Sequence, residues 1–318
     1  MDMWSEGRVD VWNMKRLMVR WSGQPEKRQS TAALQKVGAM ALVSCLVFTG
    51  CVAPDPSRSA APEDVYAWAD VRFEKVVLFK PSAPDSGELQ TKLAPLLIRE
   101  TTNLPASSKA GTFGIVDFSR EPLSVDTSQP AVYYHLGSLQ LNGEPHTAAT
   151  YVWFLRNGAV RSEPNPVRVE GVRITLSTTG QPIIWEILNG TEAWELLFVS
   201  REIEAAALKE FGLPLPCRKF STEHSLREAP KTVVARVIED GPVLMGPIVY
   251  LNKAGDVSTL ICRCMPAQAK EVTFTETYEL LPLSALDPAQ ITKLLKPKWW
   301  PGVNNERAHS MLRIPKGY

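Results

Sequence analysis

The cysteines are the residues of this chain whose chemistry and spacing are most specific. Cys262 and Cys264 are two residues apart in a segment predicted to be a strand, so their side chains share one face, roughly 6.5–7 Å apart. Cys217 occurs earlier in the chain. Thiols of this kind can pack as small hydrophobic groups, form disulfides in an oxidising compartment, or bind a metal as thiolates.

Three interpretations of these cysteines stay open. In the first, Cys262 and Cys264 are core residues on the same apolar face as Leu260. In the second, Cys217 forms a disulfide with one of them, which leaves an odd thiol. In the third, the three cysteines and His224 form a metal or redox site. A direct bond between Cys262 and Cys264 is disfavoured, because it would strain an extended strand.

Paired carboxylates occur in one loop. Glu239 and Asp240 precede an apolar stretch that contains two Gly-Pro steps, Gly241-Pro242 and Gly246-Pro247. Such a loop could recognise a partner, or its carboxyl groups could act as acid and base. The alternative is a rigid turn whose carboxylates face solvent.

The commonest catalytic and cofactor motifs are absent from the sequence. It has no phosphate-binding Gly-Lys-Ser/Thr loop, no Gly-x-Gly-x-x-Gly, no Gly-x-Ser-x-Gly and no His-Glu-x-x-His. The four histidines are far apart in the sequence: His135, His146, His224 and His309. We therefore expect no cofactor, and the sequence identifies no catalytic residue.

A basic segment precedes an uncharged one near the start of the chain. Its cations are Lys15, Arg16, Arg20, Lys27, Arg28 and Lys36, and residues 37–48 carry no charge. As a helix those twelve residues would span about 18 Å, less than the roughly 30 Å hydrocarbon core of a bilayer. A basic region followed by a short apolar one is typical of a secretory signal.

The residues that end this segment, Phe48-Thr49-Gly50-Cys51, resemble the lipobox of bacterial lipoproteins. That motif has an apolar residue, two small residues and the cysteine that receives the lipid, although Leu is preferred where this chain has Phe48. The resemblance implies cleavage after Gly50 and a thioether-linked diacylglycerol on Cys51. It also implies a protein anchored in a membrane of the bacterial cell envelope, facing the periplasm or the cell surface.

The pattern of composition predicts three parts. Residues 1–50 form a signal-peptide region, whose true start is expected at Met14 or Met18. Residues 51–66 are rich in Pro, Ala and Ser and form a flexible tether. Residues 67–318 form the folded domain, in which the loop-rich stretch 213–231 could divide two lobes.

Overall composition excludes several classes of protein. The 318 residues include 35 Lys+Arg and 34 Asp+Glu, a formal net charge of +1. A general nucleic-acid binder needs a strongly basic face, so nucleic acid is not an expected partner. A hydrophobic fraction of 44% is that of an ordinary folded protein rather than a disordered chain or a polytopic membrane protein.

Hydrophobic periodicity predicts an α+β fold with a mainly antiparallel sheet, a β-meander with hairpins, and two or three helices. Strands are predicted at 71–79, 113–118, 131–141, 148–156, 172–177, 183–188, 232–238, 248–251, 257–264 and 272–281. Helices are predicted at 86–102, 200–211 and 287–295. Asn189-Gly190 is typical of a two-residue hairpin loop, which would place Trp185 opposite Trp194. Asn142-Gly143 also indicates a turn, within a loop expected to be longer.

We interpret the chain as a lipid-anchored cell-envelope protein whose partner is the membrane, through Cys51, and whose domain binds a ligand or gives structural support. One alternative is an envelope enzyme, a hydrolase or a thiol or metal site, whose residues converge only in the fold. The other is an intracellular globular protein without a lipid anchor, in which residues 37–48 form a core helix.

Overall fold

Strands make up most of the structure. The computed structural model describes residues 62–70, 72–82, 87–101, 112–119, 123–156, 167–188, 194–238, 244–262, 268–289, 292 and 310–318. The strands are β1 (Phe73–Pro81), β2 (Leu96–Glu100), β3 (Phe113–Asp117), β4 (Ser124–Asp126), β5 (Ala131–Leu141), β6 (Glu144–Arg156), β7 (Val167–Leu176), β8 (Pro182–Leu188), β9 (Glu195–Ser200), β10 (Thr232–Ile238), β11 (Ile248–Leu251), β12 (Val257–Ile261) and β13 (Ala269–Pro282). The helices are α2 (Pro62–Trp68), α3 (Leu89–Lys92), α4 (Arg201–Phe211) and a 3-10 turn, η1 (Leu283–Ala285).

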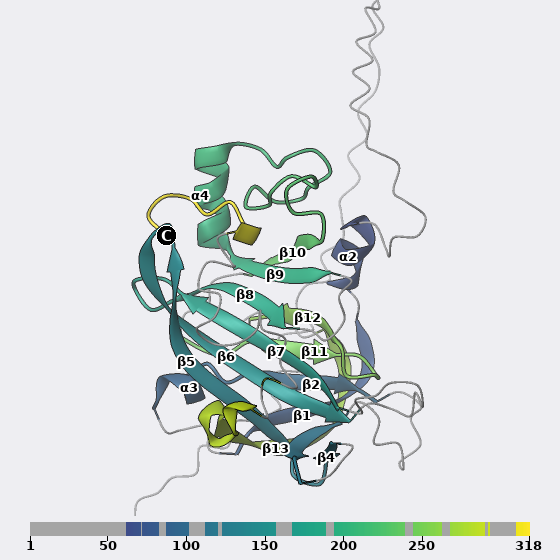
Figure 1. Ribbon diagram of the computed structural model, residues 1–318. Coiled ribbons are helices and arrows are strands. Elements are labelled where there is room, and N and C mark those ends of the chain that lie inside the picture. Colours follow the sequence, from purple (N-terminus) through teal and green to yellow (C-terminus); the bar gives the residue numbers. More distant parts are fainter. Residues whose placement is uncertain are drawn as a thin grey trace, which may run out of the picture. The chain divides into compact units, whose positions relative to one another are not determined.

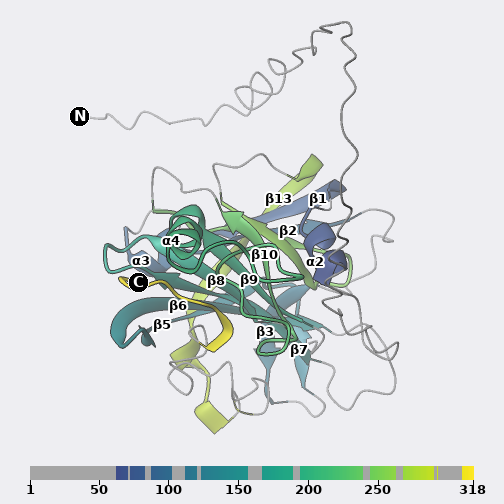
Figure 2. The ribbon, with the colours of Figure 1, turned by 90° about the horizontal axis from the view of Figure 1, so that it is seen from above.

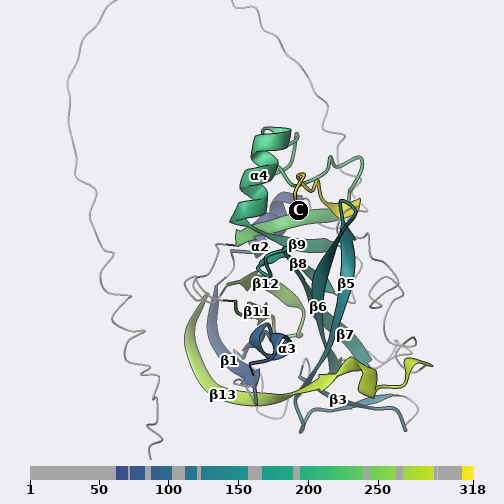
Figure 3. The same cartoon turned by 90° about the vertical axis from the view of Figure 1, so that its left-hand side faces the viewer.

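These strands form one mixed sheet that curls into a nearly closed barrel (Figures 1 and 3). Its order is β10-β9-β8-β7-β6-β5-β13-β1-β2-β11-β12, and β3 and β4 are attached beside β6. The strands β10 and β12 therefore lie at the two ends of the sheet. All the described residues belong to one compact unit of the chain, Cys51–Tyr318.

The prediction of an α+β fold with a mainly antiparallel sheet is wrong. Four strand pairs are parallel: β1 with β13, β2 with β11, β5 with β13, and β9 with β10. The strand β13 comes from the end of the sequence and inserts between β1 and β5. Periodicity within one segment reports which face is buried, but it carries no information on such distant pairing or its direction.

The turn between β5 and β6 is tighter than the sequence suggested. Leu141 pairs directly with Glu144, so Asn142 and Gly143 form a two-residue loop. Both have positive φ, 50° and 86°, which is the geometry that Asn-Gly adopts in the tightest hairpins. The expectation of a longer loop was wrong because β6 begins at Glu144 rather than near residue 148.

The register predicted for the two tryptophans is also wrong. Trp185 on β8 lies opposite Phe198 on β9, four residues away from Trp194. An even shift keeps the same side chains on the same face of a strand. Trp185, Trp194 and Phe198 accordingly all lie in the same buried cluster. The predicted burial of both tryptophans on one face therefore holds, while their predicted pairing does not, and Asn189-Gly190 lies outside the described residues.

The long helix predicted at 86–102 is a short helix followed by a strand. Helix α3 ends at Lys92, and β2 begins at Leu96. Pro95 has no N–H and disfavours helical backbone in the residue before it. Beyond it, Leu97 and Ile98 point to opposite faces of the sheet, into two different buried clusters. A short apolar run fits either element, and Pro95 decides between them.

Helix α4 confirms the prediction made for 200–211. The Ser200 side chain accepts a hydrogen bond from the Ile203 N–H at 3.3 Å, and Gly212, with φ of 80°, ends the helix. Both signals are local, which is why the sequence was sufficient here. The helix predicted at 287–295 lies mostly outside the described residues.

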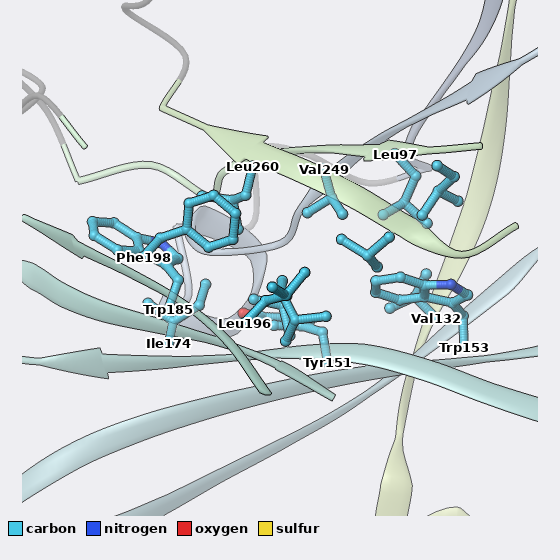
Figure 4. Packing of buried hydrophobic residues seen from close by; sticks show 14 of the residues in the cluster. Leu97, Val132, Tyr151, Trp153, Ile174, Trp185, Leu196, Phe198, Val249 and Leu260 are labelled. Atoms are coloured by element: carbon cyan, nitrogen blue, oxygen red, sulfur yellow. The ribbon is translucent and has the colours of Figure 1, made fainter. Parts of the chain in front are cut away.

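The interior of the barrel is packed with large side chains from both halves of the sheet (Figure 4). Trp153 and Trp185 come from the β5–β9 half, and Leu97 and Val249 come from the β1–β12 half. Two tyrosines fix the segment around α3: Tyr151 donates to the Gln90 carbonyl at 2.6 Å, and Tyr278 donates to the Pro95 carbonyl at 2.7 Å.

Candidate functional site

Helix α2 joins the two end strands of the sheet. The carbonyl oxygen of Ala69, just after α2, accepts a hydrogen bond from the Thr259 hydroxyl on β12 at 3.0 Å. The same oxygen accepts a hydrogen bond from the guanidinium of Arg236 on β10. Arg236 also forms an ion pair with Asp70 at 2.9 Å. We call this arrangement, completed by Tyr66, the α2 clasp.

Burial in the clasp disfavours the charged form of the Arg236 guanidinium and so lowers its pKa. The negative charge of Asp70 opposes that shift, and so does Tyr250. Val65 of α2 and Ala69 are buried in the barrel core. The clasp is therefore apolar on its inner side, while Asp70 on its outer side is largely exposed.

A second contact fixes the middle of α2. The Tyr66 hydroxyl lies 2.9 and 3.0 Å from the two carboxylate oxygens of Glu223 and donates to that group. Glu223 is 2% exposed and also accepts the N–H groups of Lys219, Phe220 and Val234, each within 3.0 Å. Burial raises the pKa of Glu223, and these hydrogen bonds oppose that shift. Burial and the nearby carboxylate raise the pKa of Tyr66.

The turn formed by residues 218–223 connects α2 with α4 and β10. The guanidinium of Arg218 donates to the carbonyls of Thr232 and Ala229 and lies 3.5 Å from Glu223 Oε1. On the other side, Glu204 of α4 accepts the N–H of Ser221 at 2.7 Å. Two carboxylates thus hold an irregular segment in one conformation, as buried polar groups require.

The polar groups of the clasp attach α2 to the barrel, and their hydrogen bonds are made within the protein itself. Both oxygens of Glu223 are occupied by donors from the protein itself. A general acid or base needs a free position toward a substrate. The Glu223 carboxylate and the Tyr66 hydroxyl instead stabilise the position of α2 on the barrel.

A partly buried charged cluster makes another connection across the barrel. Arg168 on β7 forms an ion pair with Asp256 at 2.6 Å and donates to the Ala254 carbonyl at 2.6 Å. Its Nε lies 3.7 Å from Glu170 Oε1, and Glu170 is fully buried. Asp256 and Ala254 belong to the turn between β11 and β12. Arg168 therefore ties the two halves of the sheet together.

The structure places two of the three cysteines left open by the sequence. Cys217 is exposed on the segment after α4 and has a φ of 62°. Cys262 follows β12, packs against the core and is disulfide-bonded. Cys264 and Cys51 lie outside the described residues. Among those described, no group of three or more His, Cys, Asp or Glu side chains could hold a metal ion. A metal or redox site involving Cys264 stays a prediction.

The loop with paired carboxylates is described only in its second half. Glu239 and Asp240 lie outside the described residues, so their role stays a prediction. Gly246 donates its N–H to the Lys92 carbonyl at 2.7 Å, and a Cβ added there would lie 2.1 Å from the Ala94 carbonyl oxygen. Close packing of two backbones therefore requires glycine at position 246.

Three of the four histidines lie among the described residues. His146 is buried, with Nδ1 2.8 Å from the Leu176 carbonyl oxygen. His224 Nδ1 lies 3.6 Å from a carboxylate oxygen of Glu228. Burial lowers the pKa of His135. Each of these three thus has its own separate environment, and His309 lies outside the described residues.

The residues of the clasp were missed by the sequence reasoning. Tyr66 falls within residues predicted to be tether, and Glu223 is 157 residues away from it.

Comparison of the chain with known protein families, curated proteins and solved structures found no match. Within the described part, no helix is long and apolar enough to cross a bilayer.

Proposed function

We propose that this chain is a lipid-anchored protein of the bacterial cell envelope, whose barrel domain binds a ligand or gives structural support. The observation that carries the proposal is the run Phe48-Thr49-Gly50-Cys51 at the end of an uncharged segment. On this proposal the working protein begins at Cys51, and two or three acyl chains hold it stably in the membrane.

The position of α2 supports this proposal. Ten residues lie between Cys51 and Pro62, where α2 begins. A lipid at Cys51 would therefore be joined by a short tether to the element that clasps the end strands of the barrel. Firm attachment of α2, the first described element, is what an anchored domain needs, because any pull on the tether acts on it.

The disulfide at Cys262 supports an exported protein. Disulfides persist in oxidising compartments such as the periplasm, and they are rare in the cytosol. A binding or supporting role, rather than catalysis, is favoured by Glu223, whose carboxylate is fully engaged within the fold.

The test compares processing of the full chain with that of two variants in a bacterial host. The wild type and the control Cys217→Ala should give a membrane-bound form that starts at Cys51 and carries the mass of a diacylglycerol and, in many hosts, a third acyl chain. Cys51→Ala should keep residues before position 51 and carry no lipid. If Cys51→Ala and the wild type have the same processed ends and no lipid mass, the proposal is lost.

A further inference from the structure

The segment that follows α4 exposes a continuous uncharged surface. Residues 212–217, Gly-Leu-Pro-Leu-Pro-Cys, carry no charge, and none of them is buried. The Leu213 side chain is 80% exposed, and Leu208, one turn earlier on α4, is 46% exposed. Isolated apolar side chains are common on protein surfaces, but a contiguous run suggests a contact site. We call Leu208 and residues 212–217 the apolar strip.

The apolar strip lies at the same end of the molecule as α2. It leads directly into the turn at 218–223, where the rings of Tyr66 and Phe220 are 6.3 Å apart and the Lys219 N–H donates to the Tyr66 hydroxyl at 3.3 Å. In Figures 1 and 3, α4 and the segment after it project from the barrel, and Figure 2 shows α2 and α4 on either side of β9 and β10.

The length of the tether limits how far this end can be from an anchored Cys51. Ten residues separate Cys51 from Pro62, and an extended chain of that length spans at most about 40 Å. A bilayer that holds the lipid of Cys51 is therefore within about 40 Å of α2. Since α2 is fixed to the turn at 218–223, the apolar strip lies at the end of the domain to which the tether is joined.

Cations accompany the apolar strip. Lys209 follows Leu208 and is exposed, and the Nζ atom of the exposed Lys219 lies 5.6 Å from the centre of the Tyr66 ring. Lysine near apolar side chains suits a bilayer interface, because its stem packs with lipid while its ammonium group meets anionic headgroups. The exposed Glu210, between Leu208 and residues 212–217, accepts a hydrogen bond from the Lys316 N–H at 2.8 Å.

We infer that the apolar strip rests in the headgroup region of the bilayer and gives the domain a second membrane contact beside the lipid at Cys51. This inference rests on the proposed lipid anchor. Its consequence is orientation: a domain held at Cys51 alone could tumble on its tether, whereas the strip would fix the α4 end toward the membrane. Leu213 would enter deepest, because it is the most exposed of these apolar side chains.

The test measures the depth of a nitroxide spin label on the lipidated full-chain product in vesicles of phosphatidylethanolamine and phosphatidylglycerol. The label is attached at Leu213→Cys in a Cys217→Ser background, and the same background without the added cysteine is subtracted. The matched control is Phe274→Cys, because Phe274 is also an exposed apolar residue, 52% exposed, but lies on β13. Flotation of the vesicles is measured first, since it reports anchoring alone.

The inference predicts that oxygen collides more often, and a water-soluble nickel complex less often, with the label at 213 than with the label at 274. Equal, water-like collision rates on floated vesicles would overturn the inference and leave the anchor intact. A fall in both rates at 213 would mean contact with protein, such as a second copy, and would also overturn it. A chain that does not float removes the proposed anchor, and the inference with it.

Discussion

The Tyr66 hydroxyl lies 2.9 and 3.0 Å from the two carboxylate oxygens of Glu223, although 157 residues separate them in the sequence. This hydrogen bond attaches the first described helix to the middle of the connection between α4 and β10. Together with the Ala69 carbonyl, which contacts both Arg236 and Thr259, it holds α2 across the ends of the sheet.

Tyr66→Phe should lower the free energy of unfolding by about 1–3 kcal/mol, because it removes a donor from a buried carboxylate. Urea unfolding of the full chain, followed by intrinsic fluorescence, measures the change. The matched control is Tyr134→Phe, whose hydroxyl forms no hydrogen bond among the described residues and whose loss should change stability by less than about 0.5 kcal/mol. Equal effects of the two substitutions would contradict the role of Tyr66.

Glu223 should make stability depend on pH. Burial raises its pKa in the folded protein above the ordinary value of 4.5, so between these two values the folded state binds the proton more tightly than the unfolded state. Its contribution is therefore most favourable below about pH 4.5 and is lost as pH rises through the folded pKa. Glu223→Gln cannot titrate, so the stability difference between wild type and variant should move in favour of the variant as pH rises. A difference that stays constant with pH would rule this out.

Arg168→Met should be strongly coupled to Glu170→Gln. The first substitution removes the Arg168 cation from beside the fully buried Glu170 and from its ion pair with Asp256, at a cost of roughly 2–4 kcal/mol. Neutralising Glu170 removes part of that cost, so the double variant should be more stable than the sum of the two single effects predicts. Equilibrium unfolding of the four proteins forms the double-mutant cycle. Simple additivity would show that the two side chains do not interact.

Gly246→Ala should destabilise the fold by about 1–3 kcal/mol, because its Cβ would meet the Ala94 carbonyl oxygen at 2.1 Å and force two backbones apart. Gly137→Ala is the control. There the nearest atom is His135 Nε2 at 3.0 Å, the end of a side chain that can move. Thermal unfolding should therefore show a much larger fall in Tm for the first substitution, and similar values for both would contradict this packing.

The parts of the fold that the sequence predicted are those decided by neighbouring residues. Ser200 and Gly212 mark the ends of α4, and alternation marks many of the strands. The position of β13 could not be predicted, because it pairs with Phe73 and Ala131, both more than 140 residues earlier than their partners. The α2 clasp could not be predicted either. Its acceptor at Ala69 is a backbone carbonyl, which every type of residue carries, so the sequence does not mark it.

The residues of the candidate sites also differ in whether a local sequence pattern marks them. The resemblance to a lipobox is a local pattern, and the proposed lipidation of Cys51 rests on four consecutive residues. Tyr66 and Glu223 carry no local motif, and they are important only because distant segments meet.

The central claim is that the working protein is anchored by lipid at Cys51. The most direct test is the intact mass of the chain purified from the membranes of a host that processes lipoproteins. We predict the mass of residues 51–318 increased by a diacylglycerol and, in many hosts, by a third acyl chain. A chain that retains residues before Cys51, or that begins at Cys51 without added lipid, would contradict the account.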